Sequence, residues 1–79
     1  MKLQYRTLTS GNNILECDKN MYIAELKVIL SANTKLIQGS FYLLHKDTFT
    51  RLENDDYTLE DYDVQDNDTI NVILNLRGD

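Results

Sequence analysis

The chain carries one histidine, His45, and one cysteine, Cys17, which belong to the residue types that most often act as general base and as nucleophile. No serine accompanies either residue in a pattern typical of a nucleophilic triad. Cys17 falls at an inward-facing position of a predicted strand, where cysteine behaves as a small hydrophobic residue. We therefore expect no catalytic residues and no enzymatic activity.

Carboxylates are the second group of residues that could carry a function, because they can bind a metal ion. Eight of them, and no lysine or arginine, lie between Leu52 and Leu76: Glu53, Asp55, Asp56, Glu60, Asp61, Asp63, Asp66 and Asp68. The glycine and the terminal glutamate of a calcium-binding loop are absent. We expect no metal ion and no cofactor, and we interpret the run either as a solvated acidic edge or as an acidic docking surface.

The length and net charge limit the possible partners. Seventy-nine residues predict one domain, residues 1–79, and the net charge of −5 argues against binding to nucleic acid. No apolar run approaches the ~20 residues that span a bilayer, so no membrane partner is expected. A single cysteine excludes an internal disulfide, and a free thiol without a secretory signal indicates the cytoplasm or the nucleus. We expect a monomer.

Hydrophobic periodicity predicts the elements that position these residues. Alternation with a period of two predicts strands at residues 1–7, 14–18, 41–46, 50–52 and 69–76. Ile23, Leu26 and Leu30 recur at helical spacing, which predicts a helix at 22–33, with Asn20 as its N-terminal cap. One helix covers one face of a sheet, so we predict a two-layer α+β domain whose other face stays in water.

Two apolar residues fall on the face that is predicted to stay in water. The inward face of the strand 41–46 carries Phe41, Leu43 and His45, and its outward face carries Tyr42, Leu44 and Lys46. In the last strand, Ile73 shares the outward face with polar residues. An exposed apolar side chain forgoes about 1.5–3 kcal/mol of available burial. Leu44 and Ile73 therefore indicate a surface that a partner covers.

The order of these elements resembles that of the ubiquitin family, and several strings carry the resemblance. They are Met1-Lys2-Leu3, Arg6-Thr7-Leu8-Thr9, Leu15-Glu16-Cys17-Asp18, Thr58-Leu59-Glu60-Asp61-Tyr62-Asp63-Val64-Gln65 and Asn71-Val72-Ile73-Leu74-Asn75-Leu76-Arg77-Gly78. The strings occur in order over the whole chain. The resemblance implies a β-grasp ubiquitin-like fold with a mixed sheet of four to five strands on one α-helix. Departures are expected in the Lys46–Phe49 connection and around Asn54.

The C-terminal residues depart from the family pattern. Ubiquitin and its conjugated relatives end in a diglycine, whereas this sequence ends Arg77-Gly78-Asp79. The resemblance implies that attachment to other proteins needs a terminal glycine carboxylate, and Asp79 adds a side chain and a charge there. We expect no attachment of the chain as it stands. The alternative is a conjugated modifier, formed if a protease removes Asp79 and exposes Gly78.

The resemblance also implies a binding site. Leu8, Leu44 and Ile73 match the family's apolar recognition patch. Around them we expect a basic rim with an aromatic residue at its edge: Arg6, His45, Lys46, Arg51, Arg77 and Tyr42. The implied partners are proteins with ubiquitin-binding helices, proteasome subunits, or the rest of the chain's own host polypeptide. The alternative is that the patch is exposed incidentally or serves an intramolecular contact.

Overall fold

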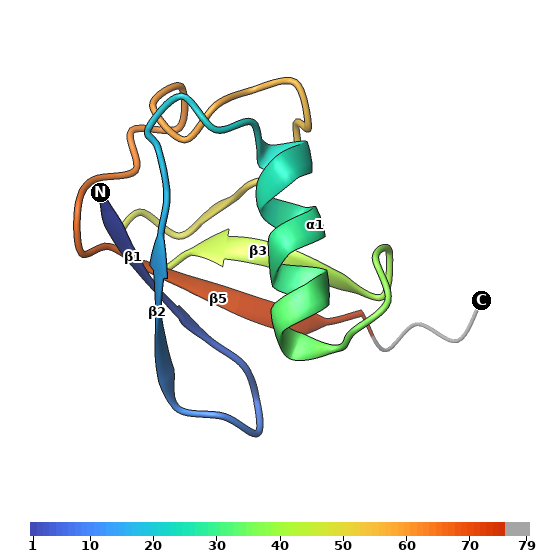
Figure 1. The fold of residues 1–79 in the computed structure, drawn as a ribbon. Coiled ribbons are helices and arrows are strands. Elements are labelled where there is room, and N and C mark those ends of the chain that lie inside the picture. Colours follow the sequence, from blue (N-terminus) through green and yellow to red (C-terminus); the bar gives the residue numbers. More distant parts are fainter. Residues whose placement is uncertain (76–79) are drawn as a thin grey trace.

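The computed structural model describes residues 1–75, and in them a five-stranded mixed sheet packs on one helix (Figure 1). The elements are β1 Lys2–Arg6, β2 Asn12–Glu16, α1 Ile23–Thr34, β3 Phe41–His45, β4 Thr50–Arg51 and β5 Thr69–Leu74. The strands lie in the order β2-β1-β5-β3-β4. Strands β1 and β5 are parallel, and the other neighbours are antiparallel. The predicted α+β β-grasp architecture is confirmed.

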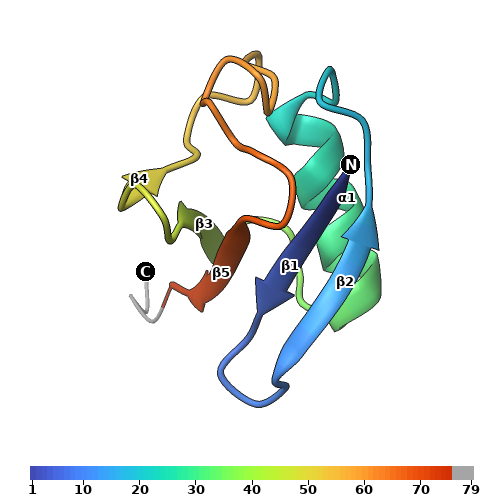
Figure 2. The same ribbon diagram turned by 90° about the vertical axis from the view of Figure 1, so that its left-hand side faces the viewer.

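Helix α1 forms because its apolar residues share one face. Ile23, Leu26 and Leu30 are fully buried, as their spacing predicted. They pack with inward residues of the sheet, among them Leu3, Leu43 and Ile70, in one hydrophobic core. Figure 2 shows the helix on one side of the sheet, with no helix on the other side among the described residues. This one-sided arrangement leaves the outer sheet face uncovered.

The start of helix α1 differs from the prediction. Asn20 does not cap the helix; its backbone N–H instead donates to the Asp18 carboxylate within a turn. The first helical amide, that of Ile23, donates to the carbonyl of Tyr57 at 2.8 Å. Glu25 accepts a hydrogen bond from the N–H of the residue before the helix. A loop distant in sequence therefore supplies part of the cap, which a local pattern does not reveal.

The strand bounds differ from the predictions by a few residues. Strand β2 begins at Asn12, two residues before the predicted start, and ends before Cys17. Residues 59–63 form hydrogen-bonded turns, in which the Tyr62 N–H donates to the carbonyls of Thr58 and Leu59. The predicted end of the last strand, Leu76, lies outside the described residues. Among the described residues, no helix has the length and apolar character that crossing a membrane requires.

The helix face gives a direct test of the core. Leu26→Ala is expected to lower the free energy of unfolding by about 2–5 kcal/mol, because removal of this fully buried side chain leaves a cavity in the core. Val28→Ala is the matched control, since Val28 lies on the same helix and is 53% exposed; its effect should stay within about 0.5 kcal/mol. Urea unfolding followed by circular dichroism measures both. Equal losses in the two variants would contradict the packing described.

Candidate protein-binding surface

Apolar side chains gather on the outer face of the central strands β3 and β5. Burial alternates along both strands, and the outward residues Tyr42, Leu44 and Ile73 are half-buried. Tyr42 pairs with Ile73 across the two strands, and Leu44 pairs with Asn71. Leu44 is therefore a diagonal neighbour of Ile73, a separation of about 7–8 Å that long side chains bridge. The register places the three apolar groups side by side.

Leu8 joins this surface from the turn between β1 and β2. Its side chain is 88% exposed and contributes little to the core. A hydrogen bond from the Ser10 backbone N–H to Thr7 Oγ1, 2.9 Å long, helps to hold the turn. A groove of about 500 Å³ separates Leu8 from Ile73; it is lined by Arg6, Thr7, Leu8, Asn71, Val72, Ile73 and Leu74. Ile73 thus neighbours Leu44 on the sheet and lines the same groove as Leu8, and we call these three residues the apolar patch.

Basic residues lie around the apolar patch. Arg6 and Lys46 are exposed, and Arg6 contributes to the groove. The Arg51 guanidinium carbon lies 4.1 Å from the centre of the Tyr42 ring, a cation–π contact that places Tyr42 at the edge of the patch. Arg77, the fifth predicted rim residue, and Gly78, the possible conjugation terminus, lie outside the described residues. The observed basic rim is therefore Arg6, Lys46 and Arg51.

The expectation that His45 belongs to the exposed rim is wrong. Its side chain is only 1% exposed. Nε2 lies 2.7 Å from the Asp68 carboxylate, and Nδ1 lies 2.9 Å from the hydroxyl of Thr48. The physical reason is the strand alternation, which puts residue 45 on the same side as Leu43, facing the core. The rim prediction followed the resemblance and disregarded the period of two.

The sequence did not reveal which residues form hydrogen bonds with His45. A histidine at an inward strand position needs polar neighbours, because buried polar groups are almost always hydrogen-bonded. That signal was present in the sequence. The identity of the neighbours was not, since Asp68 is 23 residues away along the chain. Asn71 and Leu74, which line the groove, were likewise recognised only from the fold.

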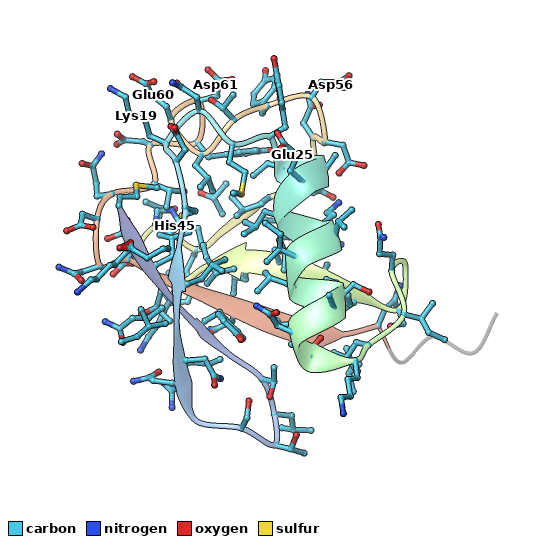
Figure 3. All side chains as sticks on the ribbon, in the orientation of Figure 1. Lys19, Glu25, His45, Asp56, Glu60 and Asp61 are labelled. Carbon is cyan, nitrogen blue, oxygen red and sulfur yellow. The ribbon has the colours of Figure 1, made fainter. Side chains whose placement is uncertain are left out.

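Charge is divided between two parts of the surface. The outward positions of β1, β3, β4 and β5 include Arg6 and Arg51 and carry no carboxylate. The whole acidic run lies in the connection between β4 and β5, which passes the N-terminal end of α1 (Figure 1). Figure 3 labels Asp56, Glu60 and Asp61 there, away from the turn that carries Leu8. A negatively charged chain therefore presents a basic surface around its apolar patch.

Cys17 has the environment of a structural cysteine. It is half-buried and packs against the hydrophobic core. Burial, and then the neighbouring carboxylates of Glu16, Asp18 and Asp66, raise the pKa of the Cys17 thiol against the opposing effect of the N-terminal ammonium. A raised pKa leaves little thiolate at neutral pH, and the thiolate is the nucleophilic form. The environment of Cys17 therefore disfavours a role as a nucleophile.

Comparisons with known proteins agree with this architecture. A family model described as the ubiquitin family matches residues 3–77, nearly the whole chain. A comparison with curated proteins finds no matching sequence. The matched range includes helix α1, strands β2 to β5 and all of β1 except Lys2, as well as the three residues of the apolar patch.

The environment of Cys17 predicts slow alkylation. At pH 8 the folded chain should react with iodoacetamide more slowly than the same chain unfolded in guanidinium chloride, because burial both raises the pKa and limits access. The pH at which the folded rate reaches half its maximum should lie above the value measured for the unfolded chain. Mass spectrometry of the alkylated fraction against time measures both. A folded rate equal to or above the unfolded rate would contradict the described environment.

Proposed function

Because the chain belongs to the ubiquitin family, we propose that it acts as a recognition domain that other proteins bind non-covalently through the apolar patch. The proposal is supported by the neighbouring positions of Leu44 and Ile73 on the uncovered sheet face, and by the exposed Leu8 that lines a groove with Ile73. Apolar groups that share one exposed surface gain free energy when a partner removes them from water. The proposed role is to be bound, without catalysis.

The chemistry of the surface favours an amphipathic helix as the bound element. Leucine or alanine anchors on such a helix fit the apolar groove beside Leu8, in the manner of helix-in-groove recognition. Acidic flanks on the helix would pair with Arg6 and Lys46. Ubiquitin-binding helices of receptor proteins have this character, and a proteasome subunit that presents one is a further candidate. These partners would place the chain in the cytoplasm or the nucleus.

The small size of the apolar patch implies weak binding. Association must offset lost translational and rotational freedom, estimated at 4–15 kcal/mol or more, before any net affinity remains. A groove of about 500 Å³ and three apolar side chains supply a modest surplus. We propose dissociation constants of roughly micromolar or weaker, which suits reversible recognition.

The patch can be tested by truncating its members one at a time. Leu8→Ala and Ile73→Ala should each weaken binding of a ubiquitin-interacting helix peptide by roughly tenfold, because each removes an apolar anchor from one side of the groove. Leu8→Ala is the cleaner variant, since Leu8 is almost fully exposed and contributes little to the core. Isothermal titration calorimetry of the folded variants gives the affinities.

Val28→Ala provides the control for these two variants. Val28 is an exposed aliphatic residue on α1, in the layer opposite the outer sheet face. Its replacement should leave the affinity unchanged. If Val28→Ala bound the peptide more weakly while Leu8→Ala kept its affinity, the peptide would bind the helix side. The proposal would then fail.

Conjugation through Gly78 is the second candidate, and the string Arg77-Gly78 that the sequence shares with the family favours it. A chain tagged at its N-terminus and produced in cells should show no higher-mass adducts if it acts only by docking. Adducts that disappear in a Gly78→Ala variant would establish attachment, and the mass of the processed C-terminus would show whether Asp79 is removed. Leu8→Ala should leave such adducts in place if attachment and docking are independent.

A further inference from the structure

A cluster of one buried histidine and two more exposed aspartates, at the end of β3, lies outside the proposed docking surface. It consists of His45 and two carboxylates, one from the β3–β4 turn and one from the residue before β5: Asp47 and Asp68. One potential ligand atom from each residue lies within 4.8 Å of the other two. Among the described residues, the ion pairs of both carboxylates are made with His45 alone. Two negative groups therefore converge on one imidazole.

The hydrogen bonds around His45 identify which ring nitrogen faces the carboxylates. The Thr48 hydroxyl donates its hydrogen to Thr50 Oγ1 at 2.9 Å, and Thr50 in turn donates to the Thr48 carbonyl. Thr48 Oγ1 lies 2.9 Å from His45 Nδ1, so the hydroxyl and this ring nitrogen share a hydrogen bond. The other ring nitrogen, Nε2, therefore faces Asp47 and Asp68. A metal ion bound there would replace the hydrogen bond between Nε2 and Asp68.

The distances suit a small divalent ion. Nε2 lies 2.7 Å from Asp68 Oδ2 and 3.7 Å from Asp47 Oδ2. Ligand atoms that hold zinc tetrahedrally at about 2.0–2.1 Å lie about 3.3 Å from one another. The two observed distances fall on either side of that value. To hold one ion, Nε2 and Asp68 Oδ2 would separate slightly from their hydrogen-bond distance, and Asp47 Oδ2 would approach Nε2.

The surroundings of the cluster orient its ligands and leave one side open. Asp47 Oδ2 accepts from the Thr69 backbone N–H at 3.1 Å, and Asp68 Oδ2 accepts from the Gln65 backbone N–H at 2.8 Å. Outer hydrogen bonds of this kind orient metal ligands and raise affinity. The Asp47 side chain is 51% exposed, so solvent reaches the cluster from its side and a water molecule can complete the coordination.

We propose that His45, Asp47 and Asp68 form a site for a divalent transition-metal ion of the zinc type. One imidazole and two carboxylates, with an open fourth position, match the ligand chemistry of Zn²⁺. The sequence predicted no metal ion because the two aspartates belong to no recognisable ligand spacing. The bound ion would tie the β3–β4 turn to the start of β5. The site is independent of the proposed docking function.

Titration of the folded chain with Zn²⁺ alone tests the site. Calorimetry should show saturable binding of one ion per chain. The ¹H–¹⁵N spectrum should change first around residues 45–48 and 65–69. Asp47→Asn should weaken binding at least tenfold, because the amide is a poor ligand, yet its oxygen can still accept from Thr69. His45→Phe should abolish binding at the site.

Asp56→Asn is the matched control, because it removes an equal charge from an exposed residue of the acidic run, apart from His45 in Figure 3. Its zinc affinity should equal that of the unchanged chain. Failure to saturate at millimolar zinc would overturn the proposal, because no site would then exist. Unchanged affinity in Asp47→Asn and His45→Phe would also overturn it, since the ion would then bind elsewhere. Asp47→Asn keeps the experiment decisive should His45→Phe fail to fold.

Discussion

The packing of one amphipathic helix against one side of the sheet is the constraint on which the rest of the structure depends. Leu26 and Leu30 on the helix meet Leu43 and Ile70 from the sheet, and burial of these apolar groups is the main driving force for folding. A domain of 79 residues has a small core and no disulfide to assist it. Twelve helical residues cover a single sheet face, so the opposite face remains available for recognition.

The alternation of side chains along β3 puts the two proposed sites on opposite sides of this strand. Leu43 and His45 point inward, whereas Leu44 points outward beside Ile73. A shift of one residue in register would exchange these faces, placing Leu44 in the core and the imidazole in solvent. Pairing of β3 with β5 therefore sets the geometry of the apolar patch and of the histidine–aspartate cluster together. The two sites share a scaffold while using different chemistry.

The sequence predicted the helix face and the order of the elements along the chain, because both depend on local periodicity or on strings shared with the family. The apolar patch as a binding site stays a prediction. Ile23, Leu26 and Leu30 needed only their spacing. The hydrogen-bond partners of the buried His45 could not be predicted, because Asp68 is separated from it by 23 residues along the chain. The helix cap escaped prediction for the same reason, since Tyr57 supplies it from another loop. The Lys46–Phe49 connection, where departures from the family were expected, contributes Asp47 to the cluster.

The most direct test of the recognition proposal is a methyl NMR titration with a ubiquitin-interacting helix peptide, using chain labelled at leucine and isoleucine methyl groups. The methyl signals of Leu8, Leu44 and Ile73 should shift together along one binding curve, while those of buried Leu26 should move little. Shifts confined to residues outside the outer sheet face, or no shifts at millimolar peptide, would contradict the proposal that this face is the docking surface.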